Sequence, residues 1–299
     1  KTTIIPVKLL DNPNINGQII ILEPRRLAAR AAASQMAAIL NERIGETVGF
    51  KIKGLTKVSK QTRIVVMTEG ILIRMIQSDP SLSEVGCIIF DEFHERSINS
   101  DLGLALSLQL SEILRSDLRI VVMSATLDVG PVSDLLDTKA PIISDGRAYD
   151  VNCEYLSRPR SKNNKLWENF AQLISDAFEM TEGGILAFLP GEAEIRATEK
   201  LLKEKLPNAA IIMPLYGSLP FEQQNKILEP LKDETFRKVV LSTSIAETSL
   251  TISGIKVVVD SGYTRRSRYD PTSGMSRLIT QKISKAEANQ RMGRAGRVA

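Results

Sequence analysis

The chain has 299 residues, enough for two domains that each bury a core of their own. With 43% hydrophobic residues, 25% charged residues and a net charge of +4, the composition excludes a disordered or fibrous protein and is compatible with a phosphate-binding surface without requiring one. No apolar stretch approaches the roughly 20 residues of a membrane span, and Cys87 and Cys153 lack the spacing of a zinc site or disulfide framework, so we expect no membrane partner and a reducing, cytoplasmic compartment.

Short runs of β-branched residues alternate with longer helical patterns along the chain. They predict strands at residues 18–22, 63–67, 85–90 and 119–123, and again at 184–189, 210–215, 238–242 and 256–260. Helices are expected at the alanine-rich residues 27–40 and at 192–205, where apolar residues recur at helical spacing. This order is typical of an α/β fold with mostly parallel sheets and helices on both faces of each sheet.

The two groups of four strands are separated by residues 144–155, which contain the turn-forming Asp145-Gly146-Arg147. We therefore expect two tandem domains, residues 1–147 and 148–299, with the boundary near residue 147. The chain opens directly on Lys1-Thr2 and closes just after a charged motif, so we expect further regions of the parent protein on both sides.

Two adjacent carboxylates, Asp91 and Glu92, follow the apolar run at residues 87–90. Open parallel sheets bind ligands at the carboxyl ends of their strands, and an acidic pair placed there can divide the work of phosphoryl transfer. One carboxylate holds a hydrated Mg²⁺ while the other orients or deprotonates an attacking water. A solvated acidic turn is the alternative for an isolated pair of this kind.

Two further signals lie outside the acidic pair. His94 is the chain's only histidine, and its position two residues after Glu92 favours a coupling role over a place in the core. Lys1 and Thr2 match the last two residues of a P-loop, in which the lysine reaches the β- and γ-phosphates and the threonine hydroxyl binds Mg²⁺. Two residues alone are equally compatible with an arbitrary terminus.

An arginine-rich box near the other end runs Gln290-Arg291-Met292-Gly293-Arg294-Ala295-Gly296-Arg297. Helical spacing would place Arg294 and Arg297 along one face, where guanidinium groups can stabilise charge on a transferring phosphoryl group. A solvated basic helix face is the alternative, but it gives no account of the regular glycines.

Taken together, these motifs resemble the DEAH/DExH group of superfamily 2 helicases. The resemblance covers nearly the whole chain in order: Lys1-Thr2, residues 23–30 (EPRRLAAR), Thr68-Glu69-Gly70, Asp91-Glu92-Phe93-His94, Ser124-Ala125-Thr126, residues 188–191 (FLPG), residues 242–252 (STSIAETSLTI) and the arginine-rich box. Within the group, phenylalanine in the third position of DEFH, together with DLGLAL at residues 101–106, is similar to the bacterial HrpB type.

The resemblance implies two RecA-like domains that hydrolyse ATP with Mg²⁺ between them. Lys1, Thr2 and Asp91 would hold the phosphates and the metal, and Glu92 would be the general base. Gln290 would place the attacking water, and Arg294 and Arg297 would reach the γ-phosphate. The remaining implied positions are Arg30, Thr251 and Ser253 beside the nucleotide, and His94, Ser124 and Thr126 as the link between nucleotide state and domain closure.

The resemblance also implies a single-stranded nucleic-acid partner, RNA more than DNA, gripped without base readout. The implied strand contacts are Arg25, Arg26, Thr68, Gly70, Thr243 and Thr248. Residues 262–278 fit a β-hairpin that wedges strands apart, with a solvated basic loop as the alternative.

This sequence departs from the group at three positions. Ser244 replaces a common asparagine, Ser253 replaces an acidic residue near the ribose, and Gln35 replaces an arginine that stacks on adenine. These changes fit tolerance of several nucleoside triphosphates. Two other functions stay open on sequence alone: an inactive RNA-binding or scaffolding module, and a nucleic-acid-stimulated ATPase that remodels complexes without unwinding.

Overall fold

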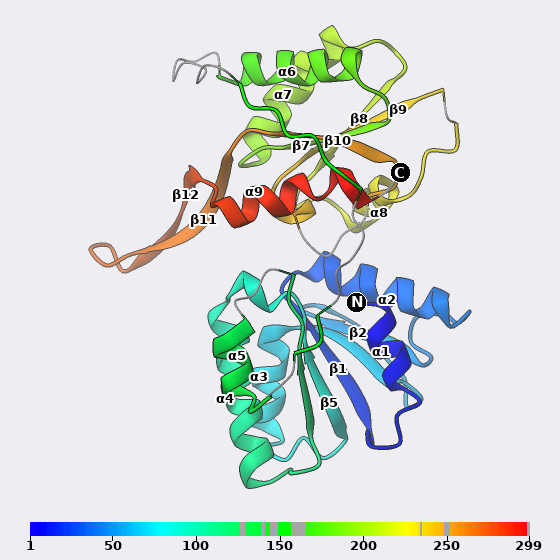
Figure 1. The fold of residues 1–299 in the computed structure, drawn as a ribbon, viewed down its shortest axis with the longest axis vertical. Helices are drawn as coiled ribbons and strands as arrows, with labels where there is room; N and C mark the ends of the chain where they lie inside the picture. Colours follow the sequence, from blue (N-terminus) through cyan, green and yellow to red (C-terminus); the bar gives the residue numbers. More distant parts are fainter. Residues whose placement is uncertain are drawn as a thin grey trace. The chain divides into compact units, whose positions relative to one another are not determined.

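The computed structural model describes residues 1–125, 129–138, 141–143, 149–156, 166–233, 235–247 and 252–297. The chain divides into two compact units, Lys1–Ile143 and Ser144–Ala299, shown in Figure 1. The boundary expected near residue 147 falls in residues 144–148, which lie outside the described ranges. Within those ranges no helix combines the length and apolar character needed to cross a bilayer.

The first unit is built on a six-stranded sheet in the order β3-β2-β4-β1-β5-β6. Its strands are β1 (Gln18–Glu23), β2 (Val48–Ile52), β3 (Leu55–Lys57), β4 (Ile64–Thr68), β5 (Val85–Phe90) and β6 (Arg119–Val122). All neighbours are parallel except β2 and β3. The four predicted strands of this half are confirmed to within a residue at each end. The strands β2 and β3 were missed, because β3 is three exposed residues long and the apolar residues of β2 are interrupted by both Gly49 and Lys51.

Helices cover both faces of this sheet, as predicted. Its helices are α1 (Ile4–Leu9), α2 (Arg26–Ile39), α3 (Glu69–Ser78), α4 (Ile98–Ile113) and α5 (Val129–Leu135). Alternate residues of β1 serve the two sides: Ile19 and Ile21 pack with α1 and α2, whereas Ile20 and Leu22 pack with α3, α4 and α5. The buried alanines of α2 leave little side-chain volume between helix and strands, which lets that helix lie close to the sheet.

The second unit has a four-stranded parallel sheet in the order β10-β7-β9-β8. Its strands are β7 (Gly184–Phe188), β8 (Ala210–Leu215), β9 (Arg237–Ser242) and β10 (Ile255–Asp260), and its helices are α6 (Leu166–Met180), α7 (Glu192–Lys205), α8 (Phe221–Leu228) and α9 (Lys285–Met292). Ile185 and Ala187 of β7 pack with α6 and α7. Phe188, the residue after Ala187, faces the other side, where Arg291 of α9 lies over its ring. The α/β class predicted from the sequence is therefore confirmed for both units.

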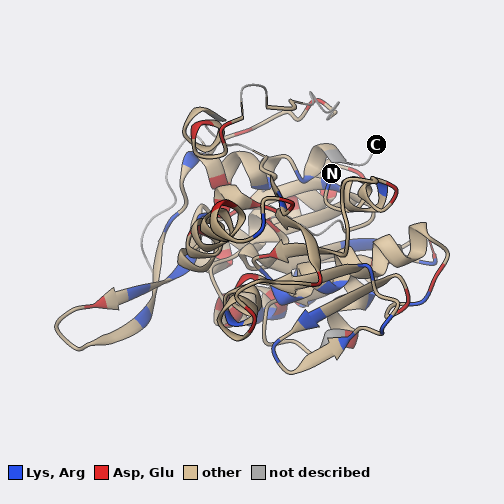
Figure 2. Ribbon diagram, turned by 90° about the horizontal axis from the view of Figure 1, so that it is seen from below, with Lys and Arg blue, Asp and Glu red and all other residues tan. Residues whose placement is uncertain are grey.

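A two-stranded hairpin extends from the second unit between its last sheet strand and α9 (Figure 1). The strands β11 (Tyr263–Asp270) and β12 (Met275–Lys282) pair antiparallel along their whole length and turn through Gly274 at φ +66°. The hairpin expected at residues 262–278 is thus confirmed, and it ends four residues later than its pattern indicated. Figure 2 shows basic residues along it; Arg266, Arg268 and Arg277 all lie on one face.

Gly17, just before β1, lies very close to the backbone of Glu84, just before β5. Gly17 and Gly45 share the same positive φ of +105°, but a Cβ on Gly17 would overlap the carbonyl oxygen of Glu84, whereas one on Gly45 meets nothing within 4 Å. Alanine strains the backbone at both positions, so the difference isolates the close approach. We expect Gly17→Ala to lower the free energy of opening of β1 and β5 by about 1–3 kcal/mol more than Gly45→Ala does. Hydrogen exchange of their amides measures this, and equal losses would contradict it.

Candidate active site

The carboxyl ends of four parallel strands in the first unit meet at one edge. In the sheet register Leu22 lies beside Phe90, Glu23 beside Thr68, and Phe90 beside Val122. Segments that are far apart in sequence therefore leave the sheet together. Asp91 follows β5, Ser124 follows β6, and Thr68 ends β4 where α3 begins.

Asp91 is the most buried acidic side chain at this edge after Glu23, with 3% of its surface exposed. Its Oδ1 accepts the backbone N–H of Glu92 at 2.8 Å, and the Thr2 side chain forms a hydrogen bond with the carboxylate. Burial raises the pKa of Asp91 and the Glu92 carboxylate raises it further, whereas the Thr2 hydrogen bond and Lys1 act in the opposite direction.

The second carboxylate oxygen of Asp91, Oδ2, is buried and has no hydrogen-bond partner among the described residues. A bare, desolvated carboxylate oxygen beside a threonine hydroxyl suits a hard cation such as Mg²⁺. The described part of the chain holds no cluster of three or more metal-ligating side chains. A cation here would therefore need phosphate oxygens and water to complete its coordination, which is how Mg²⁺ is held in nucleotide sites.

Glu92 adopts a left-handed conformation, with φ +49° and ψ +34°, immediately before the short helix η1 (Phe93–Glu95). Arg96, just after η1, has the same φ of +49°. Such backbone is costly for residues other than glycine and persists where the surroundings enforce it. Here Phe93 is buried, packs edge-on against Phe90, and donates its N–H to the Met123 carbonyl at 3.1 Å.

His94 links Glu92 to the segment after β6. The backbone N–H of Ala125 donates to His94 Nδ1 at 3.3 Å, which assigns the proton of the neutral ring to Nε2. Nε2 lies 3.4 Å from Glu92 Oε2, and Nδ1 lies 3.4 Å from the Ser124 hydroxyl. Lys1 also reaches this segment, donating from Nζ to the Ser124 carbonyl. Thr126, the third residue of the motif, lies outside the described residues.

The arginines predicted to hold a strand begin at the start of α2. Arg25 is the N-cap residue and forms an ion pair with Glu95 at 3.1 Å, while Arg26 is exposed on the first turn. Arg30 lies one turn further on, 5.4 Å from the Phe50 ring centre. Burial, followed by the charge of Arg26, lowers the pKa of Arg30.

The other predicted strand contact of the first unit is the start of α3. Thr68 is its N-cap residue and Gly70 lies in its first turn. Between them, the buried Glu69 accepts a hydrogen bond from the Ser97 hydroxyl, and Ser97 is the N-cap of α4. The threonine and glycine are thus brought close to the chain segment that carries Asp91 and Glu92.

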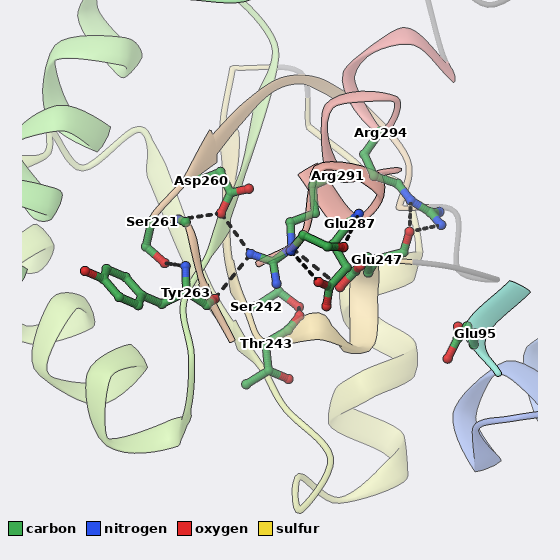
Figure 3. A network of polar contacts seen from close by, with 12 residues as sticks. Glu95, Ser242, Thr243, Glu247, Asp260, Ser261, Tyr263, Glu287, Arg291 and Arg294 are labelled. Carbon is green, nitrogen blue, oxygen red and sulfur yellow. Dashed lines mark hydrogen bonds and ion pairs between the residues drawn. The ribbon is translucent and has the colours of Figure 1, made fainter. Parts of the chain in front are cut away.

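In the second unit, Arg291 of the arginine-rich box lies at the centre of a buried network of charged side chains (Figure 3). Arg291 is only 1% exposed; its Nη1 donates to Asp260 Oδ1 at 2.8 Å and its Nε lies 3.5 Å from Glu247 Oε2. The guanidinium carbon lies 4.8 Å from the Phe188 ring centre. Sequence reasoning assigned no role to Arg291, Glu247 or Asp260. The only signals in the sequence were an acidic residue at the end of β10, Asp260, and an arginine two residues before a glycine, Arg291.

The structure corrects the expected helical face of the arginine-rich box. Helix α9 ends at Met292 with Gly293 as its C-cap, and the short helix η3 (Ala295–Arg297) follows, so Arg294 lies at a break between two helices. At the break the Arg294 N–H donates to the carbonyl of Arg291, three residues back instead of four, so the α-helical pattern stops there. Beyond it, the Gly296 carbonyl accepts the Tyr149 N–H at 3.1 Å, and a Cβ on Gly296 would lie 2.7 Å from the Tyr149 carbonyl oxygen.

Arg294 is 6% exposed and donates to the main-chain carbonyl of Glu247 from Nε at 2.9 Å and from Nη2 at 2.5 Å. Gln290 is partly buried on α9, Thr243 follows β9, and Ser253 precedes β10. Thr248 and Thr251 lie outside the described residues, as does the side chain of Arg297.

Removing one member of the buried network around Arg291 should strongly lower the free energy of unfolding of the second unit. Arg291→Ala would leave Glu247 and Asp260 without their shared cation, which typically costs about 3–5 kcal/mol. The exposed Arg268 provides a matched control whose alanine variant should change stability by less than about 0.5 kcal/mol. Urea unfolding followed through Trp167, which lies in this unit, measures both; comparable losses would show that burial of the network contributes little.

Comparison with known proteins agrees with this geometry. Residues 1–135 match the family model described as DEAD/DEAH box helicase, and residues 165–299 match the model described as helicase conserved C-terminal domain. The chain is 46% identical over 298 residues to the ATP-dependent RNA helicase HrpB of Escherichia coli, covering 100% of this chain and 36% of that protein. It is 36% identical over 313 residues to the human ATP-dependent RNA helicase DHX33, covering 99% of this chain and 43% of the relative.

Solved structures give the same result. A crystal structure of the E. coli DEAH/RHA helicase HrpB superimposes with a TM-score of 0.91 at 46% identity, over 99% of this chain and 38% of that one. A second, of the E. coli DExH-box NTPase HrpB, gives a TM-score of 0.83 over 99% and 36%. The chain spans well under half the length of these relatives. With both helicase models matched in order and similarity to HrpB along its whole length, the chain belongs to the DEAH/DExH group of the DEAD/DEAH box helicase family.

Proposed function

We propose that this chain is the motor of an ATP-dependent RNA helicase, which hydrolyses ATP and uses the cycle to move along or unwind a nucleic-acid strand. The observation that carries the proposal is the buried, unpartnered Oδ2 of Asp91 between Thr2 and Glu92. A desolvated carboxylate oxygen without a partner is destabilising by itself, so its presence points to a charged ligand that compensates for it.

The first unit would supply the metal, phosphate and base functions. Thr2 and Asp91 would hold Mg²⁺, which neutralises charge on the β- and γ-phosphates, and Lys1 would bind those phosphates directly. Glu92 would take the proton of the attacking water. His94 would orient Glu92 through Nε2, because its Nδ1 is already occupied by the Ala125 N–H.

The second unit would complete the reaction. Gln290 would place the water, and Arg294 and Arg297 would stabilise charge on the γ-phosphate, with Arg30, Thr251 and Ser253 near the nucleotide. The buried Arg291 network would hold the chain on which these groups sit. Ser124 and Thr126 would relay nucleotide state to closure of the two units, since Ser124 contacts both Lys1 and His94.

A single strand would lie on Arg25, Arg26, Thr68, Gly70, Thr243 and Thr248. Guanidinium groups, hydroxyls and backbone amides bind phosphate and sugar and carry little sequence preference. RNA is favoured over DNA by the names of the relatives. The projecting hairpin β11–β12, with three arginines on one face, would meet the strands as they separate.

Paired assays on the full-length protein test the proposal. ATP hydrolysis stimulated by single-stranded RNA, together with displacement of a paired strand, is the expected result. Stimulated hydrolysis without displacement would favour the complex-remodelling ATPase, and strand binding without hydrolysis would favour the scaffolding module.

Glu92→Gln in the full-length protein should lower the rate of ATP hydrolysis by at least about 10²-fold, because glutamine cannot accept the proton of water. Nucleotide affinity should change little, since Glu92 acts on the water. Steady-state hydrolysis and equilibrium nucleotide binding measure the two effects. As a control, Glu84→Gln removes an exposed carboxylate from the same unit and should keep the original rate. If Glu92→Gln hydrolyses ATP at the original rate, Glu92 is not the general base.

Asp91→Asn should separate stability from ligand binding. Because the folded-state pKa of Asp91 is raised, its ionised form lowers stability at neutral pH, and this cost is relieved as pH falls from the raised pKa towards the usual pKa of aspartate. The variant without nucleotide should therefore be as stable as the original protein or about 1 kcal/mol more stable at pH 7. It should also lose the extra stabilisation that ATP gives in the presence of Mg²⁺. Thermal unfolding with and without Mg²⁺-nucleotide tests both, and retained stabilisation would contradict the metal assignment.

A further inference from the structure

The segment from Asp91 to Ser97 touches four other parts of the first unit in turn. Its first half contacts the nucleotide side: Asp91 bonds with Thr2, and His94 with Ser124 and Ala125. Its second half contacts the two places proposed to hold the strand. These contacts are Glu95 with Arg25, at the start of α2, and Ser97 with Glu69, at the start of α3. The same seven residues therefore reach both kinds of site.

The Arg25–Glu95 ion pair is open to replacement. Its charged atoms lie 3.1 Å apart, and the side chains are 24% and 19% exposed, so neither partner is sealed from solvent. A phosphate is the same kind of acceptor for a guanidinium group as a carboxylate. An arginine that binds a strand phosphate therefore does so in competition with Glu95.

Glu95 lies on the short helix η1, which begins directly after the proposed base, Glu92. It is the last residue of η1, and Glu92 is the N-cap of that helix, so only two residues lie between them. The left-handed backbone at Glu92 and Arg96 brackets η1 on both sides. Surrounding contacts maintain such backbone. Removing a contact from one end of η1 therefore weakens the constraint that keeps Glu92 in its left-handed conformation.

We propose that Glu95 is a positioning residue that couples strand binding to the geometry of Glu92. Without a strand, Glu95 holds Arg25; a strand phosphate takes its place on Arg25, and the released η1 adjusts Glu92. The inference rests on the proposed function, since it requires both a strand at Arg25 and a base at Glu92. By linkage, whatever the strand does to nucleotide binding, the nucleotide does to strand binding by the same factor.

A set of variants in the full-length protein tests the coupling. Glu95→Gln removes the charge, Glu95→Asp keeps it, and Glu112→Gln is the control that removes an exposed carboxylate from α4. Glu95→Gln is also combined with Arg25→Ala and, separately, with Arg26→Ala. The measurements are the affinity for a single-stranded RNA oligonucleotide at two salt concentrations, and the affinity for a non-hydrolysable ATP analogue with and without that oligonucleotide.

Glu95→Gln should tighten RNA binding about three-fold at low salt, the size expected from losing a partly exposed ionic competitor, and less at high salt. The gain should persist in the Arg26→Ala background and vanish in the Arg25→Ala background. The factor by which RNA changes analogue affinity should move toward one in Glu95→Gln and recover at least partly in Glu95→Asp. A purely structural role would give the same change in both arginine backgrounds.

Three results would overturn the inference while leaving the motor intact. Glu95→Gln could match Glu112→Gln in both affinities, its effect could survive in Arg25→Ala, or the coupling factor could stay at its original value. Failure of the proposed function gives a different pattern, in which the unmodified protein itself shows no RNA-stimulated hydrolysis. In that case both proposals fall together.

Discussion

The common edge at which parallel strands end is the constraint on which the rest of the first unit depends. In an antiparallel sheet the segments after β1, β4, β5 and β6 would leave at alternating ends, and their motifs would be separated by the length of a strand. Parallel pairing with this register brings Thr68, Asp91 and Ser124 to one place. The buried apolar residues of these strands fix that register, because a shift by one residue would exchange the side chains that pack with α1 and α2 for those that pack with α3, α4 and α5.

The two units use charge differently. In the first, Asp91 is buried with one oxygen unsatisfied, and its neighbours Glu92 and Arg96 carry strained backbone. In the second, the buried Arg291 has two carboxylates and an aromatic face around it. The first arrangement gives up stability and is suited to binding a charged ligand. The second surrounds its buried cation with two carboxylates, although Arg291 Nε and Nη2 have no hydrogen-bond partner among the described residues, and is suited to holding a scaffold. The division agrees with a metal and base on one unit and positioned arginines on the other.

Much of the architecture could be predicted because both units are built from buried parallel strands, whose β-branched runs are easily recognised, as at residues 64–66. The edge strand β3 escaped because it is short and exposed and carries no such run, and its neighbour β2 escaped because Gly49 and Lys51 interrupt its apolar residues. The acidic pair after β5 could be located because its place follows from the strand before it. The Arg291 network could not, since its partners Asp260 and Glu247 come from two other segments and meet only in three dimensions. The end of α9 at Met292 was missed because the regular spacing of Arg291, Arg294 and Arg297 continues past it in the sequence.

Arg294 illustrates how a contact can be made independent of side-chain chemistry. Its guanidinium group binds the main-chain carbonyl of Glu247, and every amino acid, proline included, supplies that oxygen. A substitution at position 247 that kept the local backbone would abolish the ion pair with Arg291 yet leave the anchor of Arg294 in place. The orientation of Arg294 therefore depends on the backbone conformation at position 247 and tolerates changes of the side chain there, whereas the ion pair of Arg291 does not.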